Sequence, residues 1–494
     1  MLISGLALGA VLGFVMQRGR FCVTGFLRDI FTQRSWRGFV ALLIVISVHA
    51  IGLAALTSAG VITPEYNELA PLAVIVGGVI FGLGIVLAGG CASGTWYRSG
   101  EGLIGSWIAL VFYALSAAAM KTGFLNGLQD SLKDRTVGLT SIHASLGISI
   151  WPLVIALSAV TAYFAVRFLR EEFSGPRPAT LAPRKSGLAH ILTEKAWHVY
   201  ATAAIVGVLG VIAWPLSAAT GRNDGLGITT PSSNLANYVV TGDTERFDWG
   251  VLLVLGILVG SFIAAKASGE FRLRVPDATQ GARSVVGGIF MGVGAAWAGG
   301  CTVGNGMVQT SLFSYQGWLA LASIAAGVAI AAKLWLKPSA PSLNDVPSTP
   351  STTNDTAVSA TAPVASAATS PVSLPGSDSA GAAGTEASPL AGSFAVAPVA
   401  LLDRSVVKQE DGKLKPLGDG RYELDTVGAV CPFPLIEAKD AINKIEVGEE
   451  LVIPFDCTQA TDAIPRWAAK DGHEVTNFEQ TGEAGWTISV RRGK

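Results

Sequence analysis

Long stretches without any charged side chain occupy most of residues 1–337. The longest, residues 284–332, contains no Asp, Glu, Lys or Arg and is long enough for two bilayer spans, because one span needs about 20 apolar residues. Only 14% of all residues are charged and 50% are hydrophobic, so most of this chain does not face water. We therefore predict a polytopic, all-α transmembrane domain over residues 1–337, with about nine spans.

The basic residues of this domain are unevenly divided among the predicted connections. Residues 18–37, 167–195 and 266–283 are rich in Arg and Lys, whereas residues 57–68 and 302–315 contain neither. Because cytoplasmic connections carry the excess of basic residues, this alternation predicts an N-terminus outside and a C-terminal domain in the cytoplasm. The net charge of −1 leaves no overall basic field to hold nucleic acid.

One segment of the membrane domain occurs twice. Gly77–Gly94 reads GGVIFGLGIVLAGGCASG and Gly287–Gly304 reads GGIFMGVGAAWAGGCTVG, with nine of eighteen positions identical. The predicted topology runs the first copy inward and the second outward, which makes them an inverted repeat. In transporters such a repeat places the substrate site where the two halves meet, near the middle of the bilayer.

Each copy ends in Ala-Gly-Gly-Cys, a pattern that favours a broken membrane helix. The glycines allow the helix to stop and the backbone to approach a ligand, and free N–H groups at the break suit an anion. The predicted substrate pathway therefore consists of these glycines and the thiols beside them, together with a third thiol after the basic sequence QRGRF: Gly89, Gly90, Cys91, Gly299, Gly300, Cys301 and Cys22. Alternatively, each buried cysteine is only a small apolar residue that fills a gap.

Beyond the membrane domain the composition changes twice. Residues 338–400 consist mainly of Ala, Ser, Thr, Pro and Gly, which predicts a disordered linker. In residues 401–494 charged side chains return, and alternating and helical patterns predict the order βαβαββ, a two-layer α/β sandwich. Cys431 precedes Pro432 and Pro434 between the first strand and first helix, so we expect it to be the N-cap of that helix and a nucleophile with a lowered thiol pKa.

These motifs carry two resemblances. The doubled AGGC, the early RFCVTG and the nine-span layout resemble the YeeE/YedE family of bacterial inner-membrane sulfur-compound transporters over about residues 1–336. That resemblance implies thiosulfate as the substrate and a path in which it passes between the thiols of Cys22, Cys91 and Cys301. CPFP at 431–434, with Asp456 and the DAIP that follows, resembles the TusA-like (SirA-like) sulfur carriers, which implies that Cys431 carries sulfur as a persulfide.

The sequence therefore predicts a thiosulfate importer fused to its own cytoplasmic sulfur carrier, which contacts the cytoplasmic face of the transporter and passes sulfur to downstream cytoplasmic proteins. We expect no cofactor and no metal: no phosphate-binding loop occurs, and no two cysteines form a CxxC pair. The carrier domain could cleave thiosulfate itself. Cys457 has no role in the carrier family and is read as incidental, unless it lies near Cys431 and resolves a persulfide.

Two other functions stay open. One is a membrane thiol oxidoreductase that passes electrons through the buried thiols, although such enzymes use close cysteine pairs and the sequence contains none. The other is transport of a different soft sulfur or selenium species. The driving force and the role of His49 cannot be read from the sequence.

Overall fold

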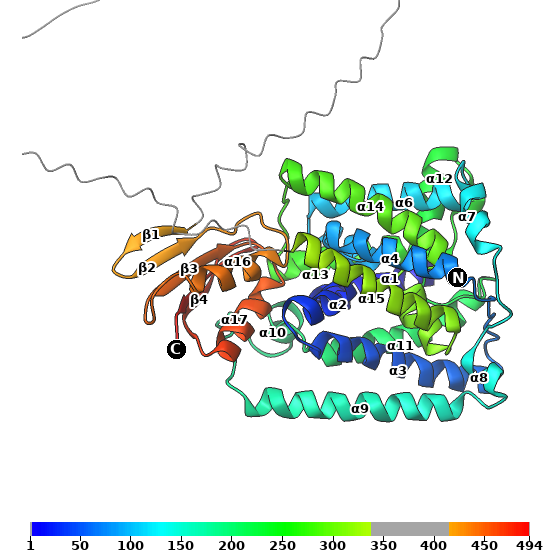
Figure 1. Cartoon of the computed structure of the whole chain (residues 1–494), viewed down its shortest axis with the longest axis horizontal. Helices are drawn as coiled ribbons and strands as arrows, with labels where there is room; N and C mark the ends of the chain where they lie inside the picture. The colour runs from blue at the N-terminus through cyan, green and yellow to red at the C-terminus, as the bar shows by residue number, and fades with distance from the viewer. Residues whose placement is uncertain (1, 337–413, 494) are drawn as a thin grey trace, which may run out of the picture. The chain divides into compact units, whose positions relative to one another are not determined.

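The computed structural model describes residues 2–336 and 414–493 (Figure 1). Residues 2–336 form a helical domain, and residues 414–493 form a small α/β domain. The predicted linker at 338–400, and the first thirteen residues of the predicted carrier domain, lie outside the described residues.

Eight segments of the described chain are long and apolar enough to cross a membrane. Two of them consist of a long helix followed by a short one: α1 (Leu2–Arg18) with α2 (Val23–Thr32), and α4 (Pro71–Leu87) with α5 (Ala92–Gly100). The break predicted at the first Ala-Gly-Gly-Cys lies between α4 and α5, as expected, whereas the break between α1 and α2 was not predicted. The other six are α3 (Arg37–Ser58), α6 (Ile104–Lys121), α9 (Trp151–Ser174), α11 (Val199–Ala218), α13 (Trp249–Ser268) and α15 (Tyr315–Trp335).

The remaining predicted span is the 21-residue helix α14 (Ala278–Ala298). It is not among the eight, although it lies against α4 and α6 (Figure 1). The count of about nine therefore corresponds to eight candidate spans and α14. Shorter helices complete this domain: α7 (Asn126–Lys133), α8 (Ile142–Leu146), α10 (Gly187–Thr193), α12 (Thr229–Thr241), the 3-10 helix η1 (Thr244–Arg246) and the π-helix η2 (Gly304–Gln309).

The two copies of the repeat pack against each other through glycine. A Cβ added at Gly84 would lie 2.7 Å from the Met291 nitrogen and 2.8 Å from the Gly287 oxygen, and one at Gly294 would lie 2.7 Å from the Gly77 oxygen. Residue numbers rise along α4 as they fall along α14, so the two helices are antiparallel. Gly77 of the first copy contacts Gly294 of the second, and the equivalent pair, Gly287 and Gly84, is also in contact. Close backbone contact of this kind requires residues without side chains.

The α/β domain contains one five-stranded sheet with strand order β1-β2-β3-β5-β4. Strands β2 and β3 are parallel and the other neighbours are antiparallel. Its elements are β1 (Leu414–Gly418), β2 (Arg421–Leu424), α16 (Phe433–Ile442), β3 (Glu450–Phe455), α17 (Ala460–Asp471), β4 (Glu474–Gly482) and β5 (Gly485–Arg491). The predicted elements are all present, and the sequence analysis missed only β1, a short edge strand that contains Pro416.

Packing of this domain follows the alternation of the central strands. In β3 the buried side chains are Leu451, Ile453 and Phe455, and in β5 Trp486 stacks on Phe455 with ring centroids 5.9 Å apart. Helices α16 and α17 cover the sheet with Leu435, Ile464 and Trp467. The result is the predicted two-layer α/β architecture.

Candidate functional site

The three cysteines of the helical domain are free and buried, with 2%, 0% and 1% of their surface exposed for Cys22, Cys91 and Cys301. Each lies where a long helix has ended and a short one begins. Cys22 is the N-cap of α2, Cys91 is the N-cap of α5, and Cys301 precedes η2. Three breaks in the helical domain therefore each bring one thiol to the start of a new helical segment.

The two AGGC breaks share a backbone conformation. Gly89 has φ +71° and Gly299 has φ +77°, a left-handed region that residues with a Cβ adopt only at a cost. The second glycine of each pair, Gly90 or Gly300, does not have positive φ. The four glycines predicted together therefore fall into two classes, and only the first of each pair is required by its dihedral angle.

Different side chains hold the two breaks in place. In the first copy, Arg98 Nη1 donates a hydrogen bond to the Gly89 carbonyl. In the second copy, Asn305 Nδ2 donates to the carbonyls of Ala298 at 2.8 Å and Gly300 at 3.0 Å, and Gln316 Nε2 donates to Asn305 Oδ1 at 3.0 Å. A buried charge thus stabilises one break, and a pair of neutral amides stabilises the other.

The structure brings Cys22 and Cys91 together. Both thiols lie beside Gly94, where an added Cβ would be 3.3 Å from Cys91 Sγ and 3.6 Å from Cys22 Sγ. Cys91 Sγ also lies 3.5 Å from Ser93 Oγ. These cysteines are far apart in the sequence, and no local pattern indicates the pair.

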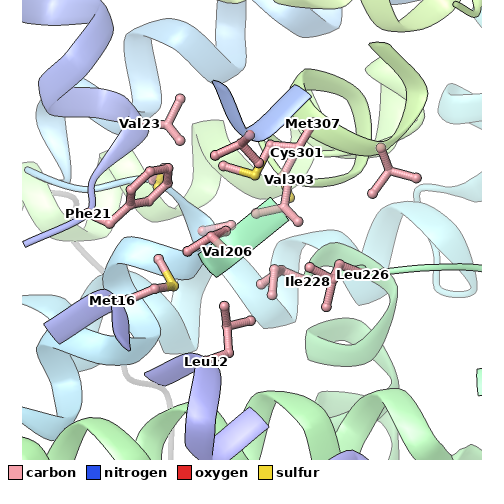
Figure 2. Close-up of a cluster of buried hydrophobic side chains, with 14 of the residues drawn as sticks. Leu12, Met16, Phe21, Val23, Val206, Leu226, Ile228, Cys301, Val303 and Met307 are labelled. Carbon is pink, nitrogen blue, oxygen red and sulfur yellow. The ribbon is translucent and has the colours of Figure 1, made fainter. Parts of the chain in front are cut away.

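Cys301 lies in apolar surroundings. Figure 2 shows its side chain near Val303 and Met307, in a cluster to which Leu226 and Ile228 also belong. Tyr113, a buried residue of α6 that belongs to the same apolar cluster as Cys301 and Cys91, donates a hydrogen bond to Thr229 Oγ1 at 2.9 Å. The sequence analysis did not identify Tyr113, although a phenol in the middle of an apolar span is a signal that could have been used.

Largely buried charged residues, Arg18, Arg20 and Glu270, lie together where α1 and α13 end. In the sequence they look like residues of the connections between spans. Glu270 accepts hydrogen bonds from Gln17 Nε2 at 2.6 Å and Arg18 Nη1 at 3.2 Å, and it pairs with Arg20 at 3.3 Å. Burial favours a higher pKa for Glu270, but Arg20 and Arg18 outweigh it and hold the pKa below its ordinary value. Nearby, burial raises the pKa of Glu101 to about 7.

His49, whose role the sequence left open, is buried, and its Nδ1 lies 3.4 Å from Ser311 Oγ. This contact fits a structural histidine. Among the residues that the structure describes, no group of three or more His, Cys, Asp or Glu could hold a metal ion.

In the α/β domain, Cys431 is bonded to Cys457 in a disulfide, with the two Cα atoms 6.3 Å apart. The predicted N-cap position of Cys431 is wrong: helix α16 begins at Phe433, its N-cap is Pro432, and Pro434 lies in its first turn. Cys431 therefore ends the loop that precedes the cap. The reason is that helical hydrogen bonding starts one residue later than the position of Pro432 suggests.

Comparisons with known proteins agree with this division into two domains. A family model described as "Sulphur transport" matches residues 18–330, and one described as "Sulfurtransferase TusA" matches residues 422–492. The thiosulfate transporter TsuA of Escherichia coli is 51% identical over 328 residues, which is 66% of this chain and 93% of that protein. The thiosulfate transporter TsuA of Spirochaeta thermophila is 32% identical over 337 residues, 65% of this chain and 94% of that protein. The putative sulfur carrier protein TsuB of Escherichia coli is 59% identical over 70 residues, 14% of this chain and 93% of that protein.

Proposed function

Because this chain belongs to the sulphur transport family and also carries a C-terminal TusA domain, we propose that it imports thiosulfate and passes the sulfur to its own carrier. The alignments with the two TsuA relatives cover nearly the whole length of those proteins, and both are named thiosulfate transporters. Their names support thiosulfate as the substrate. The observation that carries the proposal is the presence of three buried free thiols, each at a break in the helical domain.

Thiosulfate moves along a path with two thiol sites, one at Cys301 and one at the Cys22–Cys91 pair. Either site can come first on the path. A neutral thiol is a weak hydrogen-bond donor, so it meets the polarisable terminal sulfur of thiosulfate without the repulsion that a thiolate would exert on a dianion. Weak donors also release the anion, as a conducting site must. Tyr113, in the same buried cluster as Cys301 and Cys91, can turn its hydroxyl from Thr229 to the anion and so add a stronger donor than a thiol.

The orientation of the transporter in the membrane follows from the excess of Lys and Arg in alternate connections. The N-terminus lies outside, and the carrier domain lies in the cytoplasm of a bacterial cell, beside the basic end of the transporter. Contacts within the described residues support this docking: Arg466 Nη1 lies 2.8 Å from Glu172 Oε1, and Arg28 Nη1 donates to the Cys431 carbonyl at 3.3 Å. A cavity of about 50 Å³ that is lined by Arg98 and Cys431, among others, gives the anion a place to meet the carrier.

Sulfur transfer takes place at Cys431. Its thiolate attacks the terminal sulfur of thiosulfate, a new sulfur–sulfur bond forms, and the original sulfur–sulfur bond breaks so that sulfite leaves with the electron pair. The product is a Cys431 persulfide, which downstream sulfur-transfer proteins accept. Consumption of substrate on arrival draws further thiosulfate inward.

A membrane thiol oxidoreductase is the second candidate, and it is favoured by the closeness of Cys22 and Cys91, whose sulfurs both lie beside Gly94. Such an enzyme would oxidise this pair to a disulfide and move electrons, not sulfur. Radiolabelled terminal sulfur of thiosulfate separates the two functions, because only a transporter delivers the label to the inside of a sealed vesicle.

The test uses the full chain reconstituted in liposomes with thiosulfate labelled at its terminal sulfur. We expect label in the lumen and free sulfite for the wild type, with a sulfur added to Cys431 at least transiently, and no added sulfur in Cys431→Ala. A vesicle that gains no label contradicts import. Competition distinguishes related solutes: equimolar selenite or sulfide that inhibits more strongly than unlabelled thiosulfate would identify a different substrate.

A further inference from the structure

The carrier domain places two cysteines in one site. Cys431 and Cys457 are bonded to each other, although 26 residues separate them. A carrier that only passes a persulfide to the next protein needs one thiol. The second cysteine is therefore unexplained by the proposed function.

The fold itself brings these two residues together. Strands β2 and β3 are parallel neighbours, so the loops that follow them leave the same edge of the sheet. Cys457 lies two residues after β3 ends at Phe455, and Cys431 lies in the loop after β2. Their Cα separation of 6.3 Å is within the range of about 4.4–6.8 Å that a disulfide requires.

Hydrogen bonds tie the two loops to each other. Thr426 donates to the Pro454 carbonyl through its backbone nitrogen at 3.1 Å and through its Oγ1 at 2.9 Å. Gly428 N donates to Asp456 Oδ1 at 3.0 Å, one residue before Cys457. Because these bonds join the loop that holds Cys431 to the end of β3 and the start of the loop that holds Cys457, the proximity of the two sulfurs is built into the site.

We propose that Cys457 is a resolving thiol that releases the sulfur carried on Cys431 as sulfide. The inference rests on the proposed persulfide at Cys431. The Cys457 thiolate attacks Cys431 Sγ, a bond forms between the two cysteine sulfurs, and the bond from Cys431 Sγ to the outer sulfur breaks. The outer sulfur leaves as hydrosulfide.

Atoms and electrons balance in this step. The outer sulfur gains one electron as it leaves as hydrosulfide, the Cys457 sulfur loses one, Cys431 Sγ keeps its oxidation state, and the Cys431–Cys457 disulfide remains. A dithiol reductant of the cytoplasm then exchanges with the disulfide and restores both thiols. The carrier thus also acts as a reductive enzyme, and this second route supplies a reaction that incorporates free sulfide, beside the transfer of the persulfide to downstream proteins.

The experiment uses the purified, fully reduced full chain in detergent, loaded in two separate arms. In one arm thiosulfate supplies the sulfur; in the other inorganic polysulfide does so, independently of thiosulfate cleavage, and excess reagent is removed by rapid desalting. Sulfide release is then followed without added reductant, and peptide mass spectrometry reports the state of Cys431. The variants are Cys457→Ser, Cys457→Ala and Cys431→Ser.

After polysulfide loading, we expect the wild type to release one sulfide per disulfide formed, at least tenfold faster than either Cys457 variant. Both Cys457 variants should keep one added sulfur on Cys431, which also shows that their carrier site has folded. A wild type that retains the persulfide, or releases sulfide as slowly as Cys457→Ser, overturns the inference. If polysulfide gives the disulfide and thiosulfate gives no persulfide, the resolving role stands and the proposed cleavage of thiosulfate fails.

Discussion

In the first copy of the repeat, the Cys91 thiol faces a second thiol and a guanidinium holds the break, whereas in the second copy the Cys301 thiol lies among apolar side chains and amides hold the break. The backbone is nevertheless the same, with a left-handed glycine at Gly89 and at Gly299. The repeated sequence thus determines the break, and residues outside it determine the chemistry that each thiol meets.

The difference predicts unequal binding at the two ends of the proposed path. Around Cys301 the neighbours are apolar or neutral, and around Cys91 a positive charge is available from Arg98. A dianion is held more firmly where the charge is, so on the proposed path we expect tighter binding at Cys22 and Cys91 and weaker contacts at Cys301.

The largest effect is expected where the two copies touch. Gly287→Leu forces a side chain into a position where even a Cβ lies 2.5 Å from the Ala88 nitrogen, so α4 and α14 must separate. We expect a loss of about 3 kcal/mol or more in stability and no uptake. Thermal unfolding in detergent and vesicle uptake measure the two.

Gly281→Leu is the matched control, because Gly281 lies on the same helix and nothing is within 4 Å of its added Cβ. It should unfold at or above the wild-type temperature, since Leu favours helix more than Gly does. Equal stability of the two variants would show that the copies do not depend on close glycine contact.

Removing the charge that distinguishes the first copy has the next largest effect. Arg98→Gln keeps a donor near the Gly89 carbonyl but removes the positive charge. A charge-assisted hydrogen bond is stronger than a neutral one by about 1.4 kcal/mol, which is about a tenfold change in an equilibrium constant. We expect thiosulfate uptake to fall by about that factor at subsaturating substrate. Arg167→Gln, at an exposed arginine of α9, should leave uptake unchanged; an equal loss in both variants would argue against a local role of Arg98.

The two glycine classes should give the smallest, paired effects. Gly89→Ala and Gly299→Ala place a Cβ at positive φ and should each cost about 1–2 kcal/mol in the free energy of unfolding. Gly90→Ala and Gly300→Ala meet only contacts of 3.4 Å or longer and should be close to neutral. Denaturant titration in detergent compares the four; the reverse order would mean that the second glycines are the constrained ones.

Much of this architecture follows from patterns within short windows. Runs of apolar residues located the spans, the doubled Ala-Gly-Gly-Cys located the breaks, and alternation located β2, β3, β4 and β5. Each of these depends on neighbours in the sequence, which is why a single chain is enough to predict them.

What the sequence did not reveal depends on residues that meet only after folding. Cys22 and Cys91 come from different spans, and Arg18 and Glu270 look like ordinary connection residues until their mutual burial is seen. The Cys431–Cys457 contact was within reach of the argument, because the predicted βαβ unit implies parallel strands whose carboxyl ends share one edge.

Uptake by two variants that each lack one cysteine tests the central claim, that both copies contribute a thiol to one path. Cys91→Ala and Cys301→Ala, each reconstituted at equal protein density, should both lose import of labelled thiosulfate to the level of empty vesicles, while their unfolding temperatures stay within a few degrees of the wild type. Loss of a thiol leaves a gap that the anion cannot cross without being dehydrated in apolar surroundings. Import that persists in both variants would contradict the thiol path.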